Sequence, residues 1–136
     1  FYIISWLNRY RNVLKDTAQQ VQYTAKEEGV HAQVGIKLVQ VIRKELPELF
    51  DDDLKKKIVS EAKDAFAAES KIIDWILDGY SGPRLNDVVL KEYIKNRIND
   101  SMVQIGFDKI YEIDENLARD FEWMDEEVLG NSSTDF

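Results

Sequence analysis

Hydrophobic residues recur at positions i, i+3, i+4 and i+7 along almost the whole chain. Strict alternation of apolar and polar residues, which is typical of half-buried strands, is absent from the sequence. Only 6 glycines and 2 prolines interrupt the helical pattern. The sequence contains no internal repeat and no low-complexity tract. The pattern therefore predicts an all-α protein built from long helices.

The first two expected helices are separated by a short connection. Residues 1–9 form a hydrophobic first helix, and a second runs from about Asp16, a suitable N-cap, to about Lys44. It ends there because Pro47 disfavours helical conformation in the residue before it. At roughly 1.5 Å per residue this helix is about 42 Å long, well beyond the average helix of a globular protein. Helices of this length indicate a helical bundle.

Two further helices are indicated by their start and stop signals. The third begins at the acidic run 51–53 and ends before Gly79, and residues 80–85 (YSGPRL) form a turn. The fourth opens at Asn86 and stops at Gly106. The residues expected to face inward on the third helix are Leu54, Ile58, Ala62, Ala65, Ile72 and Ile76, and those on the fourth are Val89, Tyr93, Ile94, Ile98 and Ile105.

The apolar pattern weakens after Gly106. Residues 107–133 indicate an extended loop with one or two short helical turns, laid against the helices by Phe121, Trp123 and Met124. The expected architecture is thus a set of long helices with an irregular C-terminal segment.

Two other features are interpreted as structural. The tryptophans Trp6, Trp75 and Trp123 are expected to be packing anchors, because each buries a large apolar area. The run DDDLKKK at residues 51–57 is interpreted as helix capping followed by ordinary surface charge.

Composition excludes several classes of function. The formal net charge is -8, with 26 acidic and 18 basic residues, which argues against nucleic-acid binding because such binding depends on clustered Lys and Arg. No stretch approaches the roughly 20 apolar residues of a membrane span, and no signal peptide is recognisable. We therefore expect a cytoplasmic protein that binds neither nucleic acid nor membrane. The chain has no cysteine, so it forms no disulfide and carries out no thiol chemistry itself.

The length of 136 residues suits one domain with one core. The chain opens on Phe1 within an apolar run and closes on SSTDF without an obvious terminal element. We expect residues 1–136 to be a single partial domain from a longer protein. Such a fragment would expose apolar surface and self-associate.

The apolar stripe of the second helix contains two residues that do not belong there by hydrophobicity. Glu28 and His31 lie on it, and an ionised carboxylate removed from water costs several kcal/mol unless it is paired or bound to metal. Glu-x-x-His places an oxygen and a nitrogen ligand one turn apart, where they can converge on one cation. The stripe consists of Val21, Thr24, Glu28, His31, Gly35, Leu38 and Ile42.

Alternatives to a metal site remain open. His31 could be an ordinary buried histidine bound to a backbone carbonyl, with Glu28 paired to a lysine or arginine. Two chains could instead build a symmetric site from Glu28, His31 and either Glu61 or Glu69. Ferritin-like di-iron or di-manganese bundles need two histidines and four carboxylates, whereas this chain has one histidine. It can therefore supply at most half of a dinuclear centre.

A series of short motifs resembles the small (beta) subunit of class I ribonucleotide reductase, in particular its C-terminal part. KEEGVH at residues 26–31 resembles the signature Arg-Asp-Glu-x-x-His of that family. The other matches occur in the same order as in the family: Trp6-Leu7, Leu85-Asn86, LKEYI at 90–94, GFDKIY at 106–111, FEWM at 121–124 and TDF at 134–136.

The resemblance implies a partial ferritin-like helical bundle that contributes half of a dinuclear iron, manganese or mixed-metal site. The complete subunit would use this site to make the oxidant for deoxyribonucleotide synthesis, acting with the reductase large subunit and as a homodimer. Glu28 and His31 match the final two metal ligands. The radical tyrosine is expected upstream, so no catalytic residue is assigned in this chain, and the fragment alone is expected to be inactive.

Two positions depart from the family signature. Glu27 matches an aspartate that forms a hydrogen bond within the radical-transfer route, and its longer side chain changes the geometry of that bond. Lys26 replaces an arginine, so a planar bidentate donor is lost. The alternative function is a ferritin-like metal-storage or interaction module without radical chemistry.

Overall fold

The chain folds into helices joined by short connections, as a computed structural model shows for residues 1–129. The elements in these residues are α1 (Tyr2–Arg11), α2 (Lys15–Glu45), the 3-10 turn η1 (Pro47–Leu49), α3 (Asp52–Leu77), α4 (Asp87–Gln104) and α5 (Glu115–Leu129). No strand occurs in this part of the chain; a single isolated bridge joins Gly82 and Leu85. The all-α prediction is confirmed. No helix among the described residues is long and apolar enough to cross a membrane.

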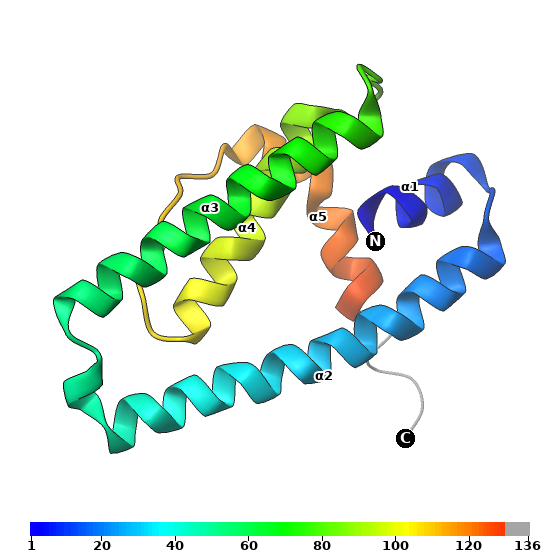
Figure 1. Cartoon of the computed structure of the whole chain (residues 1–136). Coiled ribbons are helices and arrows are strands. Elements are labelled where there is room, and N and C mark those ends of the chain that lie inside the picture. Colours follow the sequence, from blue (N-terminus) through cyan, green and yellow to red (C-terminus); the bar gives the residue numbers. More distant parts are fainter. Residues whose placement is uncertain (130–136) are drawn as a thin grey trace.

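The helices form an open frame (Figure 1). α3 and α4 pack side by side, α5 packs on α4, and α1 contacts both α2 and α5. α2 runs along the opposite side of the frame, between α1 at one end and η1 at the other. The end of α5 also contacts α2, where Gln22 Nε2 donates a hydrogen bond to Oε2 of Glu127 at 3.3 Å. The helix that carries Glu28 and His31 is thus supported mainly outside the stretch that contains these two residues.

The starts of α3 and α4 are set by local capping, as expected from the sequence. The prediction that Asp16 is the N-cap of α2 is wrong, because α2 begins at Lys15 and its N-cap residue, Leu14, makes no side-chain capping hydrogen bond. Asp51 caps α3 by accepting a hydrogen bond from the backbone N–H of Leu54 at 2.8 Å. Asn86 caps α4 in the same way, accepting from Val89 N at 2.9 Å. The acids and lysines of residues 51–57 form exposed i,i+3 pairs, Lys55 with Asp52 and Lys56 with Asp53. Their interpretation as capping and surface charge is confirmed.

The hydrophobic core lies where α1, α5, the end of α3 and the start of α4 meet. Its buried residues are Tyr2, Trp6, Ile73, Leu77, Leu85, Val89, Leu90, Phe121, Trp123 and Met124. This confirms the packing of Phe121, Trp123 and Met124 against the helices. Trp6 and Trp123 are anchors as expected, but the prediction for Trp75 is wrong, because this side chain is 80% exposed.

The inward face of α3 differs from the expected one in the middle of the helix, where Ala65 is exposed, and near its end. Ile73 and Leu77 are buried, whereas Ile72 and Ile76 are 46% and 50% exposed. Near its end α3 carries apolar residues on all of its sides, so helical periodicity alone does not indicate which side is buried. The position of the α1–α5 core decides which side is covered.

The C-terminal segment also differs from the prediction. A 15-residue helix, α5, occupies Glu115–Leu129, where one or two short turns were expected. Asp114 begins it by accepting hydrogen bonds from the backbone of Asn116 and Leu117. The many acids weaken the apolar pattern, and burial of Phe121, Trp123 and Met124 compensates for this. The motif at 134–136 lies outside the described residues.

Candidate metal centre

Glu28 and His31 approach one another on the surface of α2. Their i,i+3 spacing places them on successive turns, and Nδ1 of His31 lies 3.4 Å from Oε2 of Glu28. The side chains are 60% and 71% exposed, respectively. The two donor groups that the sequence singled out are therefore adjacent.

The expected burial of their stripe is wrong for this chain. Ala18 is the only buried residue among those described in α2, and the stretch from Lys26 to Gly35 is exposed throughout. The reason is the open frame, in which the described part of the chain covers α2 mainly outside this stretch. An exposed carboxylate stays hydrated, so Glu28 pays no desolvation penalty here that would demand a cation. The alternative of a buried pair fails for the same reason.

Other acids do not complete a site within the described residues. Glu27, next to Glu28, is exposed, and so are Glu61 and Glu69 on α3. No group of three or more His, Asp or Glu side chains in this part of the chain is arranged to hold a metal ion. The structure therefore contains one carboxylate–imidazole pair rather than a complete centre.

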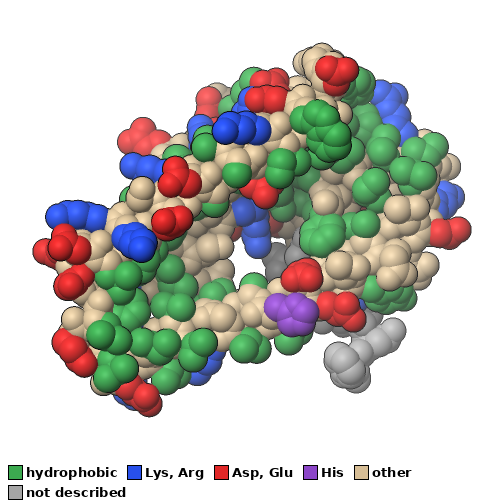
Figure 2. Space-filling view, in the orientation of Figure 1, with side chains coloured by type: hydrophobic (Ala, Val, Ile, Leu, Met, Phe, Trp, Pro, Cys, Tyr) green, Lys and Arg blue, Asp and Glu red, His purple; other side chains and the backbone are tan. Residues whose placement is uncertain are grey.

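Space next to the pair is available. A Cβ added to Gly29 or Gly35 would meet no atom within 4 Å, apart from its own neighbours in the helix. Figure 2 shows hydrophobic side chains on the surface at several places along α2 and near the end of α3. The surroundings of Glu28 and His31 are thus open to a further element.

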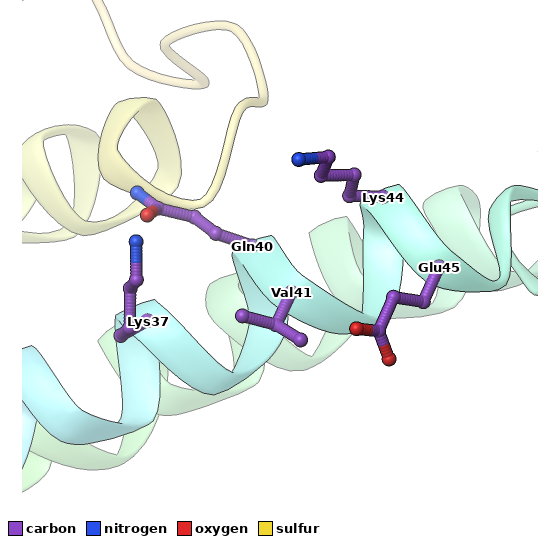
Figure 3. A pocket seen from close by; sticks show the side chains of 5 residues that line it. All are labelled: Lys37, Gln40, Val41, Lys44 and Glu45. Atoms are coloured by element: carbon purple, nitrogen blue, oxygen red, sulfur yellow. The ribbon is translucent and has the colours of Figure 1, made fainter.

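A hollow in the second half of α2 is a different feature. It is lined by Lys37, Gln40, Val41, Lys44 and Glu45, all from this one helix (Figure 3). Two lysines against one glutamate make it unsuitable for a cation. It begins six residues beyond His31, or about 9 Å along the axis. The hollow is therefore not part of the candidate metal centre.

Two of the other motifs that resemble the reductase small subunit have structural roles. Glu92, from the motif at 90–94, is buried, and its Oε1 accepts from Asp114 N at 2.8 Å while Oε2 accepts from Lys95 Nζ at 2.9 Å. The backbone of the motif at 106–111 is held by Asn99, whose side chain is fully buried. Sequence reasoning missed these roles. A signal was available, because a polar residue on the inward side of a helix needs a partner.

Tyr2, which is buried, and Tyr93, which is half-buried, have structural roles. Tyr2 donates a hydrogen bond from its hydroxyl to the carbonyl oxygen of Arg84 at 2.8 Å. Burial raises the pKa of Tyr2 far above its ordinary value, and burial also raises the pKa of Tyr93. Both rings belong to an aromatic cluster, in which the ring centroid of Tyr2 lies 5.2 Å from that of Tyr93 and 4.9 Å from that of Trp123. These residues hold α1, α4 and α5 together.

Comparison with known proteins agrees with the resemblance in the motifs. The family profile described as "Ribonucleotide reductase, small chain" matches residues 1–117. A "Ribonucleoside-diphosphate reductase subunit beta" of Aquifex aeolicus (strain VF5) is 38% identical over 101 residues, which cover 73% of this chain and 14% of that protein. The protein of the same name from Chlamydia pneumoniae is 26% identical over 127 residues, covering 93% of this chain and 35% of the relative.

The match has two consequences. The chain spans about a third or less of the length of these relatives. The fold of the family is a ferritin-like helical one, and the helical structure agrees with it. Because the profile covers residues 1–117, which include Glu28 and His31 and are well over half of the chain, the chain belongs to the ribonucleotide reductase small-chain family.

Proposed function

We propose that this chain contributes half of a dinuclear metal site to the radical-generating small subunit of a ribonucleoside-diphosphate reductase. The observation that carries the proposal is the pairing of Glu28 and His31 at 3.4 Å on one face of α2, within the region matched by the family profile. Residues 1–136 would form one partial domain of that subunit.

The donor set fits iron or manganese. A carboxylate oxygen and an imidazole nitrogen are ligands that both metals accept, and the i,i+3 spacing is the one that ferritin-like bundles use. Gly29 and Gly35 leave the neighbouring space free. A bound dinuclear centre would supply the oxidation chemistry. Glu28 would neutralise part of the positive charge of the metal, and the imidazole of His31 would supply a nitrogen ligand.

Charge and hydrogen bonding beside the ligands would come from Glu27 and Lys26. Glu27 would accept a hydrogen bond in the radical-transfer route. Its side chain is longer by one methylene than the aspartate of the family signature, so it would reach farther from the helix axis. Lys26 provides a point charge where an arginine fork would grip a carboxylate at two points.

The remaining ligands would come from polypeptide outside these 136 residues, because the chain has a single histidine. The subunit would act with the reductase large subunit and as a homodimer, in the cytoplasm. Reduction of the ribonucleotide would take place on the large subunit, which agrees with the lack of cysteine here.

The single histidine makes a direct test practical. The ring C2 proton of His31 gives one isolated NMR resonance, and Mn²⁺ bound to the pair should broaden it at low molar ratios. Glu28→Gln should weaken this broadening, because it removes the anionic oxygen ligand. Glu122→Gln is the matched control, since it removes an exposed helical acid of the same type from α5.

Equal broadening in the wild type and in Glu28→Gln would show that the pair does not bind the ion together. That result, or no broadening at all in the wild type, would overturn the assignment of Glu28 and His31 as ligands.

A further inference from the structure

The second half of α2 is attached to the end of α4 through Arg43. Nη1 of Arg43 donates a hydrogen bond to the carbonyl oxygen of Ile105. The guanidinium also lies over two rings, 5.4 Å from the centroid of Phe50 and 5.2 Å from that of Phe107. We name this group, Arg43 with Phe50, Ile105 and Phe107, the Arg43 latch.

The turn after α4 is shaped to receive this guanidinium. Gly106 has φ +84°, a conformation that residues with a side chain rarely adopt. A Cβ at this position would collide with Nη1 of Arg43. Glycine therefore serves two purposes here, since it allows the turn and leaves the carbonyl of Ile105 accessible to Arg43.

Few other contacts hold this half of α2. Gln40 Nε2 donates to the carbonyl oxygen of Gln104 at 2.9 Å, and Gln33 Nε2 donates to Oε1 of Gln104 at 3.2 Å. Both bonds are exposed, so water competes for the same groups and their net contribution is small. The one buried residue among those described in α2, Ala18, lies near the other end of the helix. The latch combines a charge-assisted hydrogen bond with two aromatic contacts, which makes it the strongest attachment of this half.

We propose that Arg43 is a positioning residue that fixes the direction of α2 relative to α4. His31 lies twelve residues from Arg43, or about 18 Å along the helix. A tilt of about 10° at the latch would move His31 by about 3 Å, more than a catalytic geometry tolerates. The consequence for metal binding rests on the proposed function, whereas the attachment of α2 does not.

Hydrogen exchange on the 136-residue chain tests the attachment. In Arg43→Met, peptides from residues 33–45 should exchange about tenfold faster, the change that a loss of about 1.4 kcal/mol of local stability produces. Peptides from α4 and α5 should be unchanged. The exchange rates of Arg43→Lys should lie between those of the wild type and Arg43→Met, because an ammonium keeps the charge but lacks the planar fork of the guanidinium. Lys44→Met is the matched control, since it removes an exposed positive charge from the same last turn.

The direction of α2 can be measured separately. The chain has no cysteine, so Ala32→Cys and Ala67→Cys allow spin labels on the exposed surfaces of α2 and α3. The distribution of label distances should broaden in Arg43→Met and stay narrow in Lys44→Met.

An unchanged distribution in Arg43→Met, or equal exchange in Arg43→Met and Lys44→Met, would overturn the proposal. Faster exchange in all helices together would also contradict it, because it would make Arg43 part of the global core rather than a local latch. Neither measurement involves metal, so a failure of the Mn²⁺ experiment leaves this test intact.

Discussion

Asn99 binds the backbone of Tyr111 from both sides. Its Oδ1 accepts a hydrogen bond from Tyr111 N at 3.0 Å, and its Nδ2 donates to Tyr111 O at 2.8 Å. Oδ1 also accepts from Ile110 N at 2.9 Å. One fully buried side chain thus replaces the partners that a strand or helix would give this segment. The connection between α4 and α5 depends on it.

Asn99→Leu should therefore destabilise the protein strongly. The substitution leaves two backbone N–H groups and one carbonyl without their partner, and each buried unsatisfied group costs about 1–3 kcal/mol. We expect a loss of about 3 kcal/mol or more in the free energy of unfolding, measured by urea denaturation. Asn96→Leu, on the same helix at a half-buried position, is the control. A similar loss in both variants would contradict the role of Asn99.

The buried phenol of Tyr2 should make stability depend on pH in the alkaline range. Burial raises the pKa of Tyr2 above the value of about 10 that the unfolded chain has. The folded state therefore holds its proton longer, and the stabilising contribution is complete below about pH 10 and is lost progressively at higher pH. The free energy of unfolding should fall above about pH 10, and less steeply in Tyr2→Phe.

Tyr23→Phe is the control for that measurement, because this ring is more than half exposed. Identical pH profiles for Tyr2→Phe and the wild type would show that Tyr2 does not carry the effect. Tyr2→Phe should also lose the hydrogen bond to Arg84 at every pH, a cost of about 1 kcal/mol.

Replacing Trp6 by alanine should lower stability far more than the same replacement of Trp75. Trp6 is buried and donates from Nε1 to the carbonyl oxygen of Pro83 at 3.2 Å. Trp6→Ala should cost about 3–5 kcal/mol, whereas Trp75→Ala should change stability by less than about 0.5 kcal/mol. Thermal unfolding followed by circular dichroism measures both. A large loss in Trp75→Ala would place that ring in the core.

The chain should self-associate. Large hydrophobic side chains are exposed on both long helices: Tyr23, Val30, Val34 and Leu38 on α2, and Ile72, Trp75 and Ile76 on α3. Light scattering should give a mass above 15.9 kDa.

Charged substitutions should reverse this association without unfolding the chain. Trp75→Lys combined with Val34→Lys removes apolar surface from both helices at positions that are exposed in the monomer. A wild-type chain that stays monomeric at high micromolar concentration would contradict the expectation.

The candidate site was predictable to the extent that it is local. The spacing of Glu28 and His31 on one helix placed their side chains one turn apart, and the structure brings them to 3.4 Å. Whether this face is covered was not predictable from periodicity, because burial needs a second element. In the described residues the stretch from Lys26 to Gly35 is exposed throughout.

The sequence by itself determined where α3 and α4 begin and where α2 and α4 end, because capping and chain-breaking residues act on their immediate neighbours. Asp51, Asn86, Pro47 and Gly106 set these points, and α2 differs from its expected bounds by one residue at each end. Only the tertiary structure decided which side of α3 is buried and that the acidic segment after Asp114 becomes a long helix. Both outcomes depend on contacts with residues far away in the sequence, whose burial outweighs a weak local preference.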